Sequence, residues 1–330
     1  MFRKFLIDIK LCFANFLTLQ CLASPQMKVM GLFQLKKLVC LFVALSFFAI
    51  VSCAPKEVAQ LLPAKKPARV AVVLGAGAAR GFSHIGVLKI LESHKVPIDM
   101  IVGSSVGSLV GSIYAAGFNA FQLQTMAIAV QRDDLIDFTL PDNGFIHGER
   151  LEKFVNKTVA RIRLEQMRIP LRVVATDIQT GKETVFATGD TGWAVRASCS
   201  IPGVFQPVRI GNNTYVDGGV VSPVAVDAAK KAGADVVIAV DISSGVGGAV
   251  PQKTIDTILQ AIGIMYAKIA EAQLKNADVV IRPKVGAIAA GDFDSRDEAI
   301  LEGEKAALSA MPQIQQILAN LRQEGRLRSQ

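Results

Sequence analysis

The first feature that could carry out chemistry is a serine between two glycines. Ser105 lies at the centre of Gly103-Ser104-Ser105-Val106-Gly107, which has the pattern G-x-S-x-G. Small residues on both sides allow the strained strand-to-helix turn that projects a serine hydroxyl above a sheet, at the mouth of a cleft. A hydroxyl presented in this way is typical of a nucleophile in acyl transfer. Glycine-rich turns between strands and helices are common, so this interpretation depends on what the rest of the chain supplies.

A serine nucleophile needs a base, and the histidines of this chain are poorly placed for that role. In α/β-hydrolases an acid and then a histidine follow the serine along the chain. Of the three histidines, His84, His94 and His147, only His147 follows Ser105. The sequence therefore does not predict an α/β-hydrolase triad, and it favours a carboxylate as the base. His84 is near a glycine-rich loop, where a packed or hydrogen-bonded role is more usual.

Asp217 is the best candidate for this carboxylate. Gly218 and Gly219 follow it, and they permit a close approach of the backbone and leave the side chain room to reach into a cleft. The alternative is an aspartate that only stabilises a turn. Because a carboxylate is a weak base in water, a basic role predicts that Asp217 is partly desolvated and that its pKa is raised.

A second glycine-rich stretch, residues 75–81, follows the first expected strand. Backbone N–H groups in such a loop can form an oxyanion hole, and the loss of one donor typically costs about 2.7 to 4 kcal/mol in the transition state. The expected donors are the amides of Gly77 and Ala78, with Ala79 as a further possibility.

The same loop has an alternative interpretation as a dinucleotide-binding fingerprint. Gly75 and Gly77 follow a strand, and Asp99 comes about 20 residues later. Two observations oppose this alternative. Arg80 occupies the position of the third glycine, with Gly81 one residue late. Asp99 also precedes its strand, whereas a ribose-binding acid should end one.

Strands and helices must position these motifs, and the pattern of apolar residues indicates where they lie. The expected strands are at residues 69–74, 98–102, 171–178, 183–187, 235–242 and 278–281. One expected helix follows the loop at 75–81, a second follows Ser105, and others lie at residues 223–232, 254–276 and 297–321. Alternating elements of this kind predict an α/β/α fold in which helices cover both faces of a mostly parallel sheet.

The expected helix at residues 254–276 carries apolar residues at helical spacing. They are Ile255, Ile258, Leu259, Ile262, Met265 and Ile269. We expect this stripe to pack on the sheet, with a membrane-facing role as the alternative.

Composition sets limits on the class of protein. The chain has 330 residues, of which 51% are hydrophobic and 19% charged, as in a globular domain with a large core. The net charge is +8, but residues 1–52 carry six basic residues against one acidic residue. Aromatic residues make up 6%, and no basic helix has interleaved aromatics, so we expect no nucleic-acid binding.

The N-terminal region resembles a secretion signal. Lys36 and Lys37 precede an uncharged apolar run at residues 38–51, and Ser52 and Cys53 follow it. The run is short for a permanent membrane helix, which usually needs about 20 apolar residues. Its end also resembles the lipobox of bacterial lipoproteins, in which the cysteine becomes the acylated first residue of the mature chain. An uncleaved anchor or a chance cysteine is the alternative.

This organisation predicts three parts and a location. Residues 1–52 are an N-terminal extension and lipoprotein signal peptide, residues 53–68 a proline- and lysine-containing tether, and residues 69–330 the globular domain. Ala54 after the cysteine resembles the signal for sorting to the outer membrane, with the domain facing the periplasm. Three of the other four cysteines precede Cys53, which leaves Cys199 alone in the domain. We therefore expect no structural disulfide, and we expect Cys199 to be a small core residue.

Together the three motifs resemble the patatin-like phospholipase family, especially its bacterial members. Residues 75–81 match the oxyanion loop G-x-G-x-x-R-G, residues 103–107 match the nucleophile elbow, and residues 217–219 match the motif D-G-[GA]. Residues 175–183 and 197–207 are similar to further segments of the family. Three motifs in this order are far more specific than any one of them.

The resemblance implies a patatin-like phospholipase domain that uses a Ser-Asp dyad without histidine. Asp217 would take the proton of Ser105 and later activate water, while the amides of Gly77 and Ala78 stabilise the oxyanion and Arg80 stabilises the loop or the oxyanion. The substrate would be a phospholipid or another acyl ester, with no metal and no cofactor. The alternative function is a lipoprotein that binds lipid or a partner with little turnover.

Overall fold

The computed structural model describes Lys37 and residues 65–140, 143–243 and 250–327. Apart from Lys37, the expected signal peptide lies outside the described residues, and so do Cys53 and residues 54–64 of the expected tether. The proposed division of the chain at residues 52 and 68 stays a prediction. The structure below is that of the unit that begins at Lys65.

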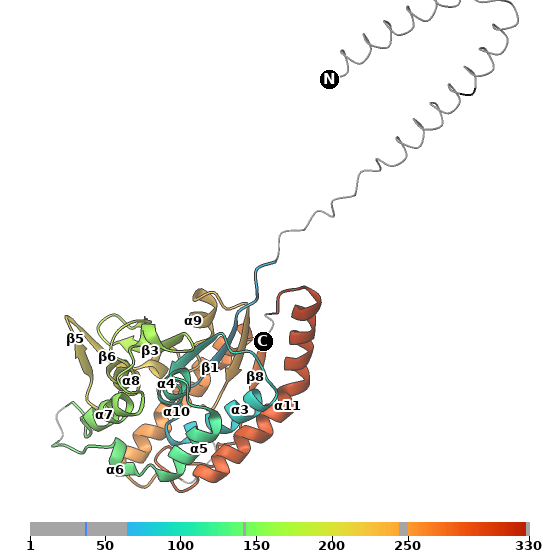
Figure 1. The fold of residues 1–330 in the computed structure, drawn as a ribbon. Helices are drawn as coiled ribbons and strands as arrows, with labels where there is room; N and C mark the ends of the chain where they lie inside the picture. Colours follow the sequence, from blue (N-terminus) through green and yellow to red (C-terminus); the bar gives the residue numbers. More distant parts are fainter. Residues whose placement is uncertain (1–36, 38–64, 141–142, 244–249, 328–330) are drawn as a thin grey trace, which may run out of the picture. The chain divides into compact units, whose positions relative to one another are not determined.

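The described part of this unit alternates strands and helices along most of its length (Figure 1). The strands are β1 (Val70–Leu74), β2 (Met100–Ser104), β3 (Leu171–Asp177), β4 (Lys182–Phe186), β5 (Val208–Ile210), β6 (Asn213–Asp217), β7 (Val236–Val240) and β8 (Val279–Ile281). The α-helices are α3 (Phe82–Ser93), α4 (Val106–Ala115), α5 (Ala120–Ala129), α6 (Arg132–Leu135), α7 (Glu149–Thr158), α8 (Thr191–Ser198), α9 (Val226–Lys231), α10 (Thr254–Gln273) and α11 (Arg296–Gln323). Short 3₁₀ helices are η2 (Ala78–Gly81), η3 (Leu164–Gln166), η4 (Gly218–Val220) and η5 (Leu274–Asn276).

All the described strands belong to one mixed sheet. Its order is β5-β6-β3-β2-β1-β7-β8, with β4 paired to β3. The five strands from β3 to β8 along this path are parallel to one another, whereas β4, β5 and β6 pair antiparallel. The expected fold class, an α/β/α fold with a mostly parallel sheet, is confirmed. Strands β5 and β6 were not expected from the sequence.

The pairing of β3 brings two chain segments together end to end. Strand β4 pairs with residues 173–177 of β3 and so occupies one edge of that strand. Strands β2 and β6, which also pair with β3, must therefore share its other edge. Strand β2 runs parallel to β3 and ends with Ser104 opposite Val174. Strand β6 runs antiparallel and ends with Asp217 opposite Ala175, the next residue. The C-terminal ends of β2 and β6 therefore meet on one edge of β3.

Two apolar cores cover the two faces of the sheet. Side chains alternate between the faces along a strand, and β1 sends Val70, Val72 and Leu74 into the larger core, where α3, α4, α7, α8 and α11 pack. Ala71 and Val73 enter the smaller core, against α9 and the end of α10. In Figure 1, α11 (red) runs alongside α3. Because both faces are covered, the central strands are continuously apolar.

Helix α10 differs in part from the expectation. The apolar stripe does not pack as a whole on the sheet: Met265 is 54% exposed, and the fully buried residues of the helix are Tyr266 and Ala270. Ile258 and Leu259, nearer its start, pack against a separate small cluster that includes Ile201. The predicted stripe is therefore packed in the first half of α10, against a loop cluster instead of strands, whereas Tyr266 and Ala270 are the buried residues of the second half. Within the described ranges, no helix is both long and apolar enough to cross a membrane.

A buried histidine joins α3 to the end of β1. His84 is fully buried, and its Nε2 donates a hydrogen bond to the carbonyl oxygen of Gly75 at 2.9 Å. Burial lowers the pKa of His84 to about 4, although the bond to Gly75 and the charge of Asp241 act in the opposite direction. The imidazole is therefore neutral in the folded protein at neutral pH, and it fixes the start of the glycine loop.

This histidine should make the domain sensitive to acid. The unfolded chain binds a proton near pH 6.5 and the folded chain only near pH 4, so stability is lost as pH falls through this window. The loss due to His84 is about 3 kcal/mol in the free energy of unfolding. Denaturant unfolding at pH 7 and pH 4 should show that His84→Gln loses less stability than the wild type. His94→Gln, at an exposed position of the same region, should follow the wild type. An equal loss of unfolding free energy between pH 7 and pH 4 in His84→Gln and the wild type would contradict the prediction.

Candidate active site

Ser105 lies in the strained turn that its sequence predicts. It follows β2 directly, precedes α4 and has φ 53° and ψ −129°, a backbone conformation that a residue with a side chain rarely adopts. An added Cβ at Gly107 would lie 2.0 Å from the carbonyl oxygen of Leu74. The glycine is thus required by the close approach of α4 to the end of β1. The turn leaves Ser105 3% exposed at the start of a helix.

Asp217 lies against the Ser105 hydroxyl. The Ser105 Oγ donates a hydrogen bond to Asp217 Oδ2 at 2.5 Å, and the Gly219 amide donates to Oδ1 at 2.7 Å. The carboxylate is fully buried. Burial raises the pKa of Asp217 to about 6, against the opposing effects of Ser105, Gly219 and the hydroxyl of Tyr266. The residue ends a strand and does not only stabilise a turn, and its desolvated state agrees with the expectation from the sequence.

The C-terminal end of α8 and the residues that follow it bind both of these residues through their backbones. The Ser198 hydroxyl accepts a hydrogen bond from the Ser105 amide at 2.9 Å and donates one to the carbonyl oxygen of Val174 at 2.5 Å. Two residues later, the carbonyl oxygen of Ser200 accepts from the Asp217 amide at 2.8 Å. The distance between the serine and the aspartate therefore depends on the position of α8.

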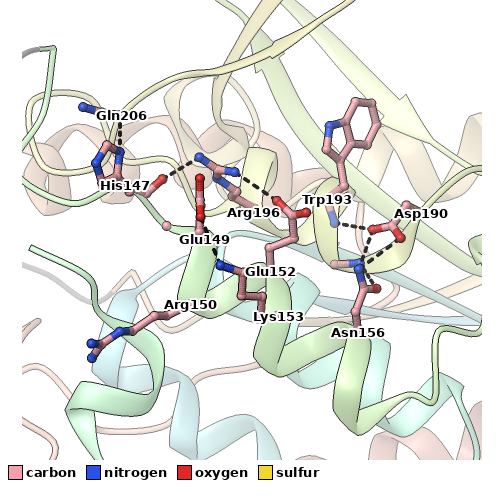
Figure 2. A network of polar contacts seen from close by, with 12 residues as sticks. His147, Glu149, Arg150, Glu152, Lys153, Asn156, Asp190, Trp193, Arg196 and Gln206 are labelled. Carbon is pink, nitrogen blue, oxygen red and sulfur yellow. Dashed lines mark hydrogen bonds and ion pairs between the residues drawn. The ribbon is translucent and has the colours of Figure 1, made fainter. Parts of the chain in front are cut away.

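A polar network fixes α8 to α7 (Figure 2). Arg196 of α8 donates hydrogen bonds to Glu152 Oε2 at 3.0 Å and to the carbonyl oxygen of His147 at 2.7 Å. At the other end of α8, Asp190 accepts from the Trp193 amide and from the side chain of Asn156. These contacts anchor both ends of the helix that carries Ser198.

None of the histidines bonds to Ser105 or Asp217. His147 Nδ1 donates to Gln206 Oε1 at 2.7 Å, in the network around α7. His84 donates its hydrogen bond to the carbonyl oxygen of Gly75. The proposal of a site without a histidine base stays a prediction.

The glycine loop leaves two amides unused. The Gly75 and Ala76 amides donate to the carbonyl oxygens of Val240 and Pro223. Ala79 donates to Ala290, so the possibility that its amide is an oxyanion donor is wrong. Among the described residues, no acceptor takes the amides of Gly77 and Ala78, and Ala78 lines a cavity with Ser105.

Arg80 stabilises this loop and is not a solvated arginine. Its side chain is 8% exposed, and its Nε donates to the carbonyl oxygen of Ile288 at 2.9 Å. Burial lowers the pKa of the guanidinium. The contact connects the loop to the segment that follows β8, whereas a direct role of Arg80 at an oxyanion stays a prediction.

The dinucleotide alternative is not consistent with the geometry. Asp99 Oδ2 accepts a hydrogen bond from the amide of Val70, at the first residue of β1. The glycine loop begins after Leu74, at the other end of the same strand. A ribose-binding acid would have to lie at the loop end of the sheet.

An apolar cavity of about 200 Å³ opens beside Ser105. Its wall is almost entirely apolar and comes from the glycine loop, from α3, α4, α5, α7 and α10, from the loops after α6 and α8, and from residues 290–293. The wall includes Leu109, Ile113, Leu123, Met126, Leu259 and Cys199. A cavity of this composition accepts a hydrocarbon chain far more readily than a polar group.

Sequence reasoning missed three side chains of this site. Ser198 belongs to a stretch that looked family-like but had no assigned role. Cys199 was expected only as a core residue, yet its buried thiol lines the cavity and contacts the Ser108 hydroxyl at 3.9 Å. Tyr266 was hidden beside the apolar stripe of α10. No local pattern marks these residues, because each reaches the site only through the tertiary fold.

Comparison with known proteins gives the same family as the three motifs. Residues 72–230 match the family described as patatin-like phospholipase. An uncharacterized NTE family protein of Mycobacterium tuberculosis is 35% identical over 184 residues, which make up 54% of this chain and 51% of that protein. Lysophospholipase NTE1 of Debaryomyces hansenii is 33% identical over 181 residues, 53% of this chain and 12% of its own length. A solved structure, VipD from Legionella pneumophila, has a TM-score of 0.44 and 13% identity, covering 75% of this chain and 67% of that one.

The aligned region is thus about half of the mycobacterial protein and about an eighth of the yeast one. Residues 72–230 are thus similar to the patatin-like phospholipase family, and the NTE-family relatives support the same family for this region.

Proposed function

We propose that the domain is a serine acyl-ester hydrolase acting on lipids, as a phospholipase A, a lysophospholipase or a related lipid acyl hydrolase. The observation that carries this proposal is the 2.5 Å contact between Ser105 Oγ and the buried Asp217 carboxylate, with Ser105 in the wall of an apolar cavity. A nucleophile, a base and a place for an acyl chain then lie within one site.

In the acylation step Ser105 Oγ attacks the ester carbonyl, and its proton moves to Asp217 Oδ2. The carbonyl oxygen becomes an oxyanion, and we propose that it accepts hydrogen bonds from the amides of Gly77 and Ala78, which donate to no acceptor among the described residues. When the intermediate collapses, the bond to the alcohol oxygen breaks and the proton passes from Asp217 to that oxygen. An acyl-Ser105 ester remains.

In the deacylation step a water molecule takes the place of the alcohol. Asp217 accepts a proton from the water as its oxygen attacks the acyl carbon, and the same oxyanion forms. Collapse releases the fatty acid and returns the proton to Ser105 Oγ. A base with a pKa near 6 is ionised at neutral pH and still accepts a proton readily, which suits both steps.

The relatives support lipid esters as the substrate class. One is named a lysophospholipase, and another, from mouse, is a patatin-like phospholipase domain-containing protein that is 32% identical over 183 residues. The apolar wall of the cavity supports the same class, because it matches an acyl chain and leaves a polar head group outside.

The N-terminal sequence supports a place of action at a membrane. We include in the proposal that Cys53 is acylated and that the domain works at the outer membrane, facing the periplasm. The apolar run before Ser52 and the lipobox-like end support this part, together with the tether that would separate the domain from the bilayer.

Removal of either dyad residue should abolish ester hydrolysis. Ser105→Ala removes the nucleophile and Asp217→Asn removes the base, so each should lower kcat/KM for a p-nitrophenyl acyl ester by about 10³-fold or more. Ser112→Ala is the matched control and should keep activity, because this buried hydroxyl on α4 donates to the carbonyl oxygen of Leu109 and has no other partner among the described residues. If either dyad variant keeps wild-type activity, the dyad is wrong. If the wild type turns over no ester and no fluorophosphonate reacts with Ser105, the domain is a binding protein.

The pKa of Asp217 should appear in both activity and stability. Activity should fall below about pH 6, where the base becomes protonated. The pKa of Asp217 in the folded state, about 6, lies above the ordinary value of 3.8, so the wild type loses stability as pH rises between these two values. Asp217→Asn lacks the titrating group and does not lose stability in this way. The variant should therefore gain up to about 3 kcal/mol over the wild type at pH 8 and little at pH 4. Denaturant unfolding at both pH values checks this, and an equal difference at both would contradict it.

Cys53→Ala should release the full-length protein from membranes. The acyl chains proposed on Cys53 would supply most of the affinity, at about 0.8 kcal/mol for each buried CH₂. Cell fractionation followed by immunoblotting measures the distribution, with Cys199→Ala as the cysteine control. A variant that stays in the membrane fraction would refute the role of Cys53 as the anchor.

A further inference from the structure

The environment of Tyr266 is unusual for a tyrosine in a packed core. The residue is 5% exposed, and its buried hydroxyl forms no hydrogen bond of normal geometry among the described residues, although it lies close enough to Asp217 to lower the pKa of that carboxyl. A buried hydroxyl without a partner destabilises the folded state, because it has lost its hydrogen bonds to water. A phenylalanine would avoid this cost, so the hydroxyl calls for a functional explanation.

The position of the ring is set by the glycine that follows Asp217. An added Cβ at Gly219 would lie 2.3 Å from Tyr266 Cε2 and 2.4 Å from its Cζ. The ring therefore packs directly on the backbone whose amide donates to Asp217 Oδ1. The absence of a side chain at Gly219 allows the phenol end of Tyr266 to reach the neighbourhood of the carboxylate.

Few other charged or titratable groups face this hydroxyl. After the larger effect of burial, Asp217, from the end of β6, raises the pKa of Tyr266 through its charge and its closeness to the hydroxyl, and the buried Cys199 thiol, after α8, lies nearby as well. Burial also raises the pKa of Cys199, so the thiol is uncharged. Arg80, from the glycine loop, lies near Gly263, one turn earlier on α10. Asp217 is therefore the group to which the Tyr266 hydroxyl would donate a hydrogen bond.

The proposed reaction removes one donor from Asp217 halfway through. In the resting site the carboxylate accepts from the Ser105 hydroxyl and from the Gly219 amide. After acylation Ser105 Oγ carries the acyl group and no proton, and Asp217 is ionised again because its proton has left with the alcohol. A buried carboxylate that has lost a partner is strongly destabilised.

We propose that Tyr266 is a positioning residue whose hydroxyl donates a hydrogen bond to Asp217 in the acyl-enzyme. The inference rests on the proposed function, since it concerns the intermediate of that reaction. The bond replaces the one that Ser105 gives up, keeps the carboxylate ionised and orients it toward the incoming water. No atom of Tyr266 enters the bonds that form or break.

The first test is the pH profile of Tyr266→Phe. With an ester that accumulates the acyl-enzyme, kcat reports deacylation, and the acid limb of kcat should move up by about one pH unit. At pH 6 kcat should fall several-fold more than kcat/KM, which reports acylation. Tyr215→Phe is the matched control, because Tyr215 is a buried tyrosine on β6 whose hydroxyl accepts from Asn213 instead. Profiles of Tyr266→Phe that coincide with the wild type would overturn the proposal, as would an equal shift in Tyr215→Phe.

A second test needs no catalysis. Ser105→Ala removes the same donor that acylation removes, so Tyr266→Phe should lower the denaturation midpoint more in the Ser105→Ala background than in the wild type at pH 8. This extra shift should vanish when Asp217→Asn is also present. Additive shifts in all backgrounds would overturn the role of Tyr266 even if esterase activity is found. A clear extra shift in a protein without esterase activity would refute the proposed function and leave the coupling to Asp217 in place.

Discussion

The buried contact between Ser105 and Asp217 is the constraint on which the arrangement depends. It exists because β2 and β6 run in opposite directions along one edge of β3 and end on neighbouring residues, Val174 and Ala175. Without β6, the residue that follows β2, Ser105, would have no side chain facing it at this edge of the sheet. The antiparallel strand supplies a carboxylate at this point, in a place too enclosed for water to solvate it.

This constraint has an energetic cost that the surroundings offset locally. The strained backbone of Ser105 and the desolvated carboxylate of Asp217 both disfavour the folded state. Opposing them are hydrogen bonds from one segment, since Ser198 binds the Ser105 amide and Ser200 binds the Asp217 amide. That segment is in turn anchored by the polar contacts of α8 with α7. The site is thus assembled by a helix that supplies none of its reacting atoms.

The features that could be predicted from the sequence are those in which the chemistry is local. The elbow at Ser105 and the loop at Gly77 are short stretches whose glycines reveal their backbone geometry, and strong apolar runs reveal the central strands. The antiparallel strand that ends at Asp217 was not recognised, because its short polar sequence has no clear alternation. The face of α10 was assigned wrongly, since apolar spacing alone does not reveal that Tyr266 packs on Gly219 while Met265 faces solvent. Contacts between distant segments leave no signal in a single sequence.

The walls of the apolar cavity have an evolutionary consequence. The serine and the aspartate stand on the sheet, whereas the cavity is lined by side chains of α4, α5 and α10 and of loops outside the sheet. Substitutions at positions such as Leu123 or Met126 on α5 can change the shape of the cavity without moving either strand end. Descendants of such a protein could therefore diverge in the molecules they accept while inheriting the same reaction, with each wall position free to vary separately.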